Sequence, residues 1–311
     1  MEDFDAIEMQ YHHRHVEIRL GNYCNFDCSF CSHDFKGGTH RPLSLDSYKK
    51  MVDNLTESTP DQILFTLQGG EPTLWPHLQE LLAYIKTKNA FIQMFSNGSR
   101  TFRWWEEFLS SCSLDRLIIS HHAEQNADPL HTEKVMKFAA GKVLDRYINV
   151  TTMSDPALFE KTVSHGRYLQ DSLPGVVVNM SPIMIKNTDS IELYTTDQLD
   201  TIKEINSKNV YNNFSKLLFG INTVYGGERT PASSQKIMFN NKNKFNKWDC
   251  DAGTYRLVVE TDEAYTGICR VSGVIGKVSD GNVNWLTAPI KCNLDYCNCG
   301  SDIIIPKRKS C

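Results

Sequence analysis

Residues 62–96 read QILFTLQGGEPTLWPHLQELLAYIKTKNAFIQMFS, and the pattern of this stretch decides the fold. The runs 62–68 and 91–96 are short and rich in large apolar residues, which is typical of strands. Between them, residues 77–88 place apolar side chains at helical spacing. A crossover of this length joins strands that run parallel. We therefore predict a β–α–β unit here.

The same alternation extends in both directions along the chain. Further strands are predicted at 15–20, 115–120, 147–153 and 175–183, and further helices at 43–55, 102–112, 129–144 and 156–172. The strands read as apolar on both faces, as buried parallel strands do. Six units within residues 16–183 fall short of the ~250 residues of an eight-stranded barrel. We predict an α/β fold with a partial (β/α)6 TIM barrel over residues 1–184, and a doubly wound sheet as the alternative.

Two segments follow the predicted barrel. Residues 185–248 break the alternation, and we interpret them as a connector or substrate-facing insertion with a helix at 195–208 and a small hairpin. Residues 249–311 contain a predicted strand at 255–261 and turn signals at 261–263 and 280–282. This last segment also carries six cysteines. We therefore predict a small Cys-rich α+β module that depends on a metal.

Composition narrows the class of protein. The 311 residues are 41% hydrophobic and 23% charged, with a formal net charge of −4, so we expect no nucleic-acid-binding surface. No apolar run reaches the ~20 residues of a membrane span, and the N-terminal residues do not resemble a secretory signal. We predict a cytoplasmic protein with no membrane partner. In a reducing compartment, clustered cysteines favour metal over disulfides, whereas the isolated Cys112 reads as a packed apolar side chain.

Three cysteines lie close together just after the first predicted strand. Cys24, Cys28 and Cys31 have the spacing CxxxCxxC on a loop. A cubane iron–sulfur cluster needs four ligands, one for each iron, so three cysteines leave one iron open for an exogenous group. Two alternatives remain: a zinc site with a fourth ligand such as His33, or three unrelated free thiols.

This spacing, with the aromatic Phe30 just before the last cysteine, resembles the signature of the radical S-adenosylmethionine (SAM) superfamily. The resemblance implies that the cysteines hold a [4Fe–4S] cluster whose open iron is chelated by SAM. It further implies reductive cleavage of SAM to methionine and a 5′-deoxyadenosyl radical, which removes a hydrogen atom from the substrate. A reductase such as a flavodoxin or ferredoxin is the implied electron donor.

The resemblance also implies SAM contacts on the loops that follow the strands. Gly69 and Gly70 let the backbone approach a ligand, and the Glu71 carboxylate suits the SAM amino group. Polar side chains at later strand ends are candidates for the SAM carboxylate and ribose, although Asn-Gly is also a common turn pair. The expected cofactor-binding residues are Phe30, Gly69, Gly70, Glu71, Ser96, Asn97, Ser120 and Met153.

Two further side chains follow Ser120 at the same predicted rim of the barrel. His122 and Glu124 are candidates for contact with the substrate or for acid–base catalysis. The alternative is that they only solvate a loop.

The C-terminal cysteines form a second candidate metal site. The candidate ligands are Cys250, Cys269, Cys292, Cys297 and Cys299. Taken alone, this segment also suits zinc. Attached to a radical SAM barrel, it resembles the twitch or SPASM type of extension. That resemblance implies an auxiliary [4Fe–4S] cluster held by Cys250, Cys269 and two of the other three cysteines. Cys311 reads as a free terminal thiol.

An auxiliary cluster implies an electron acceptor and so favours net oxidation. We therefore predict an oxidoreductase that dehydrogenates a small molecule. Peptide maturases often carry a recognition domain before the barrel, and only residues 1–14 precede the first predicted strand, so we expect a small molecule or a short peptide. The alternatives are a peptide-modifying maturase, acting by cross-linking or epimerisation, and a non-catalytic iron–sulfur or zinc protein.

Overall fold

The computed structural model describes residues 4–31, 36–183, 194–297 and 299–310. His33 and Cys311, considered above, lie outside the described residues, as does the start of the predicted connector, residues 185–193. Within the described part of the chain, no helix is long and apolar enough to cross a membrane.

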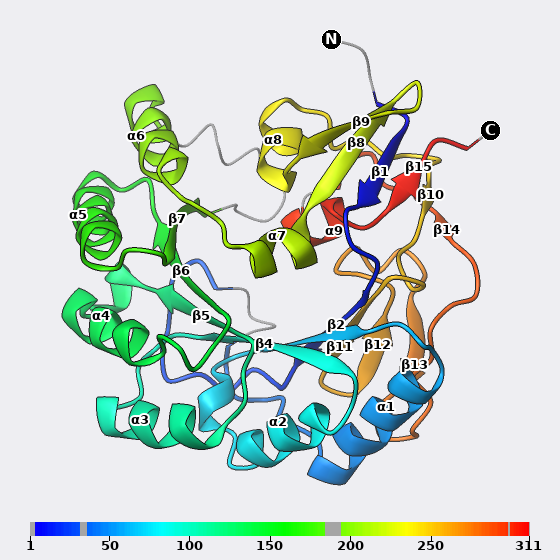
Figure 1. Cartoon of the computed structure of the whole chain (residues 1–311), viewed down its shortest axis with the longest axis horizontal. Helices are drawn as coiled ribbons and strands as arrows, with labels where there is room; N and C mark the ends of the chain where they lie inside the picture. Colours follow the sequence, from blue (N-terminus) through cyan, green and yellow to red (C-terminus); the bar gives the residue numbers. More distant parts are fainter. Residues whose placement is uncertain (1–3, 32–35, 184–193, 298, 311) are drawn as a thin grey trace.

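The six predicted strands lie side by side in one curved sheet (Figure 1). They are β2 (Arg14–Arg19), β3 (Ile63–Gln68), β4 (Ala90–Ser96), β5 (Arg116–His121), β6 (Asp145–Thr152) and β7 (Val177–Pro182). Each pairs in parallel with the next in chain order. The prediction of a mixed α/β fold with a parallel sheet is confirmed.

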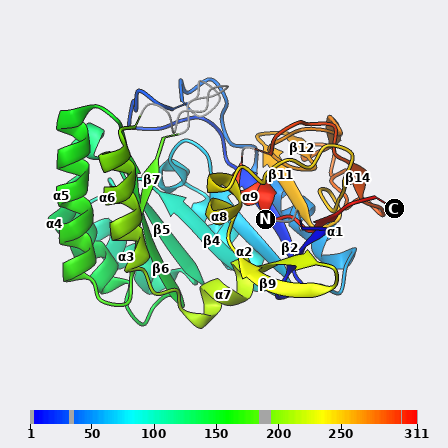
Figure 2. The same ribbon diagram turned by 90° about the horizontal axis from the view of Figure 1, so that it is seen from above.

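The predicted helices cover the convex side of this sheet (Figures 1 and 2). They are α1 (Leu45–Glu57), α2 (Leu78–Lys86), α3 (Phe102–Ser111), α4 (Pro129–Phe138), α5 (Pro156–Ser172) and α6 (Thr196–Ser207). Side-chain N-caps such as Ser44 and Asp155 start most of them. Helix α4 ends earlier than expected, and Gly141 follows shortly after it with a φ of 73°.

The two faces of the parallel sheet differ in polarity. The face under the helices is apolar and includes Val16, Phe65 and Ile148, all fully buried. The other face carries polar residues at alternate positions, for example Glu17, Thr66 and Gln93. Adjacent strands place them side by side, because Glu17 pairs with Thr66 and Thr66 with Gln93. The expectation of strands apolar on both faces is therefore wrong, since it overlooked a period of two.

The C-terminal segment extends the same sheet. Strand β11 (Arg256–Glu260) pairs in parallel with β2, and β12 (Glu263–Tyr265) and β13 (Val274–Lys277) continue it in antiparallel fashion. The sheet order is β13-β12-β11-β2-β3-β4-β5-β6-β7. The expected strand at 255–261 and the turn after it are thus confirmed, and its hydrogen bonds join it to the first strand of the predicted barrel.

A second, antiparallel sheet brings both ends of the described chain together. Its order is β14 (Ile290–Lys291), β10 (Asp249–Cys250), β15 (Lys307–Arg308), β1 (Ala6–Met9), β8 (Ile221–Tyr225) and β9 (Glu228–Ala232). Strands β8 and β9 form the small hairpin expected in the connector, turning at Gly226 and Gly227. The short helices α7 (Asn213–Phe219), α8 (Ser234–Phe239) and α9 (Gly300–Ile303) lie on the concave side of the large sheet (Figure 1).

Candidate functional site

The loop with three cysteines and the ends of the parallel strands surround one cavity of about 470 Å³. Cys24, Cys28 and Cys31 all line it. Most of the expected SAM contacts line it as well: Phe30, Gly69, Gly70, Glu71, Ser96, Asn97 and Ser120. Met153 follows the end of β6 and is not among the lining residues, where Thr151 and Ile183 are found.

The short helix η3 (Ala123–Gln125) holds the cysteine loop in place. Both carboxylate oxygens of Glu124 accept from the backbone N–H of Ser29, at 3.2 and 3.1 Å. The side chain of Gln125 accepts from the N–H of Asp27 at 3.3 Å and donates to its C=O at 3.2 Å. Glu124 thus positions the cysteine loop and is not among the residues that line the cavity. Gln125 was missed, because it belongs to no motif.

Burial raises the pKa of all three thiols in the loop. The pKa of Cys28 is raised to about 12, first by burial and then by the negative charges of Glu124 and the other two cysteines. Burial is also the largest cause for Cys24 and Cys31. Three thiolates held together here repel one another. A cationic metal group among them would therefore stabilise their deprotonated forms.

Two N–H groups donate to the sulfur of Cys24. They are the backbone N–H of Phe26 at 3.4 Å and the side-chain amide of Asn97 at 3.8 Å. Hydrogen bonds to ligating sulfurs tune the potential of iron–sulfur clusters. Among the residues that the structure describes, no three His, Cys, Asp or Glu side chains are grouped to hold a single metal ion. The evidence that this loop can hold a cluster of several metal ions is the cavity that the three cysteines share and the N–H donors to the sulfur of Cys24.

The carboxylate of Glu71 is buried and fully hydrogen-bonded within the chain. Its Oε1 accepts from Thr73 N–H at 3.1 Å, Thr73 O–H at 2.6 Å and Ser96 O–H at 2.8 Å. Its Oε2 accepts from Asn97 N–H at 2.6 Å. Burial raises the pKa of Glu71, and these four donors oppose that shift. An ionised carboxylate has about four acceptor positions. Glu71 therefore braces β4 against the glycine loop.

The two glycines before Glu71 are required by contact with the chain itself. A Cβ added to Gly70 would lie 2.1 Å from the carbonyl oxygen of Tyr23, and one on Gly69 would lie 2.7 Å from that of Gly21. Gly70 N–H donates to the Gly21 carbonyl, and Glu71 N–H to that of Tyr23, both at 2.8 Å. The glycine loop is thus packed against the backbone that leads into Cys24, which the sequence analysis had not anticipated.

His122 lines the cysteine cavity and is neutral near pH 7. Burial lowers the pKa of His122 to about 4, against a smaller opposing effect of Glu124. Its ring lies 5.5 Å from the ring of Phe30 and 6.0 Å from that of Phe26, centre to centre. Its Nδ1 is buried, with no hydrogen-bond partner among the described residues. His122 and Phe30 thus offer a neutral, largely aromatic surface to a ligand.

The neighbouring His121 supports a prediction about acid stability. Burial lowers the pKa of His121 to about 3, and the positive charges of His165, His122 and Lys161 add to this effect. Because the unfolded chain binds a proton near pH 6.5 and the folded chain does not, this stability is present above pH 6.5 and is lost as pH falls. We expect the unfolding free energy to drop by up to ~1.4 kcal/mol per pH unit from this residue.

The measurement is urea unfolding from about pH 7 to about pH 5. Replacing His121 with glutamine, which keeps a polar group for Thr132, is expected to make the pH dependence shallower by one proton. Since burial also lowers the pKa of His13, to about 4, some dependence should persist. An unchanged slope in His121→Gln would contradict the assignment.

The C-terminal cysteines lie around β10 and α9. Burial is the largest cause of a raised pKa at Cys250, Cys269, Cys297 and Cys299. Neighbouring thiolates add to it: Cys292 acts on Cys250 and Cys269, and Cys250 acts on Cys297. The five cysteines therefore share one electrostatic neighbourhood, although they come from four separate segments.

A second cavity of about 660 Å³ lies on the polar face of the large sheet. It shares Gln68, Phe95, Asn149 and Ser181 with the cysteine cavity, so the two adjoin. None of its polar lining residues belongs to a predicted site; they include Gln93, Arg116, Asn149, Asn179 and Arg256. The signal that could have found them is their alternate spacing in otherwise apolar strands.

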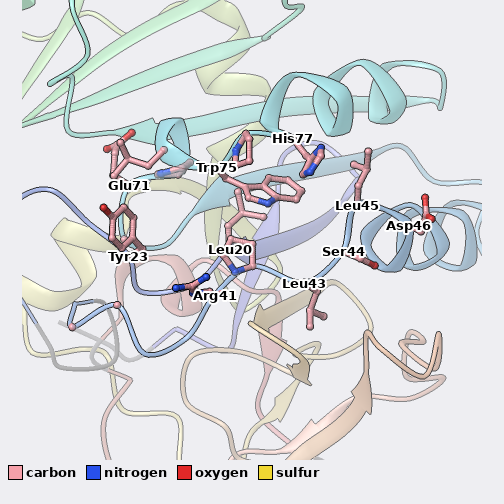
Figure 3. Close-up of a pocket in the computed structure, with 18 residues that line it drawn as sticks. Leu20, Tyr23, Arg41, Leu43, Ser44, Leu45, Asp46, Glu71, Trp75 and His77 are labelled. Atoms are coloured by element: carbon pink, nitrogen blue, oxygen red, sulfur yellow. The ribbon is translucent and has the colours of Figure 1, made fainter.

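A third hollow, of about 1020 Å³, lies behind the glycine loop. Figure 3 shows Trp75 and Leu20 within it, with Tyr23 and Glu71 at one end. Of the expected site residues, only Gly70 and Glu71 line it. This hollow is larger than the cysteine cavity, but it contains too few of the expected site residues to be assigned as the reaction site.

Comparison with known proteins identifies the family. The model of the radical SAM superfamily matches residues 18–190, which include the cysteine loop, the glycine loop and strands β3 to β7.

Curated relatives match over shorter stretches. A protein named UPF0026 protein from Helicobacter pylori (strain ATCC 700392 / 26695) is 33% identical over 89 residues, which cover 24% of this chain and 27% of that protein. A 7-carboxy-7-deazaguanine synthase from Neisseria meningitidis serogroup B is 31% identical over 83 residues, 27% of this chain and 35% of that protein. The matches thus span about a quarter to a third of these relatives.

One solved structure resembles the chain over most of its length. Native anSMEcpe with bound AdoMet has a TM-score of 0.56 and 15% sequence identity, over 86% of this chain and 78% of that chain. At this identity the likeness concerns the fold alone.

Proposed function

This chain belongs to the radical SAM superfamily, and we propose that Cys24, Cys28 and Cys31 hold the [4Fe–4S] cluster that the family uses. When bound, the cluster and SAM together supply a 5′-deoxyadenosyl radical that removes a hydrogen atom from a substrate. The observation that carries this assignment is the single cavity that the three cysteines share with the glycine loop. The chain's own residues bind, orient and shield the reacting groups.

Within that cavity, we assign SAM to the lining formed by the glycine loop, the strand ends, Phe30 and His122. The carboxylate of Glu71 already accepts four hydrogen bonds. The SAM ammonium group therefore donates to the backbone carbonyl oxygens of Gly69 and Gly70 instead. Ser120 remains a candidate for the SAM carboxylate or ribose. Phe30 and the neutral His122 form a face against which a planar base can pack.

We assign the curved parallel sheet as a partial (β/α)6 barrel and residues 249–311 as a twitch-like module with an auxiliary [4Fe–4S] cluster. Cys250 and Cys269 are the first ligands, completed by two of Cys292, Cys297 and Cys299. The electrostatic neighbourhood that these cysteines share supports the assignment. An electron-accepting group near the second cavity favours net oxidation, so the reaction we propose is dehydrogenation of a small polar molecule.

A second candidate function is modification of a peptide. The anSMEcpe enzyme, whose fold is similar, has also been solved with bound AdoMet and a peptide named Kp18Cys, at a TM-score of 0.56. In this chain, the exposed Lys216 is among the residues that line the second cavity. A cavity reached from the surface in this way suits a peptide side chain as well as a small molecule.

The test of the proposed function is anaerobic reconstitution followed by a SAM-cleavage assay. We expect the reduced, loaded protein to release 5′-deoxyadenosine and to hold about eight irons per chain, for two clusters. A fully loaded protein that releases none over a long incubation would instead be a non-catalytic iron–sulfur protein. About four irons together with zinc would exclude the auxiliary cluster and leave the first assignment standing.

A further inference from the structure

The second cavity is lined by buried hydrogen-bond donors that have no acceptor among the described residues. Most of its polar side chains bond to one another: Gln93 donates to Thr66 at 3.1 Å, and Arg116 donates to Gln93 at 3.1 Å. Asn179 likewise donates to Asn149 at 3.3 Å. These hydrogen bonds between neighbouring side chains hold the polar lining of the cavity in a fixed arrangement.

The exceptions among the described lining residues are two guanidinium groups. The unpaired buried atoms there are Arg116 Nε and the Nε and Nη1 of Arg256, and all three are donors. Arg116 Nε still lies 2.8 Å from the carboxylate of Asp145, so its charge is balanced. Arg256 is the stronger case, since its side chain is fully buried and its Nη1 has no hydrogen-bond partner among the residues that the structure describes.

The other nitrogens of Arg256 orient this free group. Nη2 donates to Glu17, and Nε lies 3.6 Å from Asp302. Because the guanidinium is planar and rigid, the hydrogen bond from Nη2 and the ion pair with Asp302 together restrict the direction in which Nη1 points. Nη1 therefore presents its N–H groups in a set position, without the entropy cost of ordering a flexible side chain.

The charges that line the cavity favour an anionic acceptor. The carboxylate of Glu17 is the one acidic side chain among the described lining residues, and it already binds Arg19 and Gln68 as well as Arg256. The remaining charged lining residues are Arg116, Arg256 and the exposed Lys216. His15 is neutral, because burial lowers its pKa well below the usual range. Among the described lining residues, a cationic ligand would find no free carboxylate, although Arg256 also faces Asp302 and the Cys299 thiol from outside that lining.

We infer that the second cavity binds a compact polar substrate through a carboxylate group placed against Nη1 of Arg256. This inference rests on the proposed function and names the substrate class. A carboxylate matches the N–H groups of a guanidinium better than a neutral acceptor does, and the charge-assisted bond is about twice as strong. The rest of the substrate extends toward Gln68 and Asn149, which also line the cysteine cavity.

The same arginine sets which end of the substrate faces which cysteines. Asp302, beside Arg256, accepts a hydrogen bond from the N–H of Cys269 at 3.0 Å. The carboxylate end of the substrate therefore lies toward the C-terminal cysteines, and the reacting end toward Cys24, Cys28 and Cys31. Substrates that carry a carboxylate at one end and an oxidisable C–H bond at the other fit this orientation.

The test compares two small probes of similar size, one with a carboxylate and one with a neutral carboxamide. We would titrate the reconstituted protein, with SAM present, with 3-fluoropropionate and with 3-fluoropropionamide, and follow binding by fluorine NMR. We expect the carboxylate to bind at least about tenfold more tightly than the amide. Equal affinities, tighter binding of the amide, or no binding of the carboxylate would each overturn the inference.

The variant that locates the probe is Arg256→Lys, which keeps a positive charge for Glu17 but removes the free N–H pair. We expect it to lose the preference for the carboxylate, while the matched control Arg146→Lys, outside the cavity, keeps it. Preference retained in a folded Arg256→Lys would refute the site. If that variant does not fold, the probe comparison in the wild-type protein still decides. SAM cleavage, measured separately, reports on the proposed function alone.

Discussion

Replacing Cys28 with alanine is expected to abolish release of 5′-deoxyadenosine from SAM. Cys28 is the most buried of the three loop cysteines, and a cluster held by two cysteines would lack a ligand for one further iron. We expect a fall of at least about a thousandfold, equivalent to ~4 kcal/mol of transition-state stabilisation. The measurement is SAM cleavage by the anaerobically reconstituted, reduced variant, together with its iron content.

The matched control is Cys112→Ala. Cys112 caps the end of α3, far from either set of cysteines in the sequence, and is a free thiol that is partly buried. It is expected to reconstitute and cleave SAM as the wild type does. Equal loss in both variants would point to a general effect of removing a cysteine, and full activity in Cys28→Ala would refute the assignment of the loop.

Replacing Glu71 with glutamine is expected to destabilise the fold as well as weaken SAM binding. Both oxygens of the Glu71 carboxylate accept hydrogen bonds, whereas the side-chain amide of glutamine has only one acceptor oxygen. With its oxygen toward Thr73 and Ser96, its NH2 group would face the N–H of Asn97, which now donates at 2.6 Å. A buried donor left without an acceptor costs about 1–3 kcal/mol. We expect the unfolding free energy to fall by about that amount in chemical denaturation.

This experiment separates two roles for one carboxylate. If Glu71 acted only by binding the SAM ammonium group, Glu71→Gln would change SAM affinity and leave the unfolding free energy of the SAM-free protein at the wild-type value. The companion variant Ser96→Ala removes one of the four donors. It should cause a smaller loss of the same kind, because the other three remain.

The parallel strands β2 to β7 could be predicted from sequence because a long helical pattern lies between each of them and the next. All six predicted parallel strands and the helices between them occur within a few residues of the expected positions. The second sheet could not be predicted in the same way. Several of its strands are two residues long, as in β10 and β15, and so short a run has no periodicity to detect.

The candidate site was predictable to the extent that it is local in sequence. The spacing of Cys24, Cys28 and Cys31 and the Gly-Gly-Glu stretch each identify a loop, and the structure places both loops at one cavity. The bracing role of Glu71 depends on Ser96 and Asn97, which follow the next strand, so no local pattern carries it. Arg256 was missed for the same reason, since it reaches Glu17 from β11.

The parallel pairing of β11 with β2 has a consequence for when the enzyme can mature. Strand β2 leads directly into the loop of Cys24, yet Glu17 and its partner Arg256 are 239 residues apart in the sequence. At the usual pace of about 5–20 residues per second, a ribosome needs roughly ten seconds or more to bridge that gap. Throughout that interval, the edge of β2 that later pairs with β11 has no partner strand. The sheet next to the cysteine loop is therefore completed only after nearly the whole chain has been synthesised.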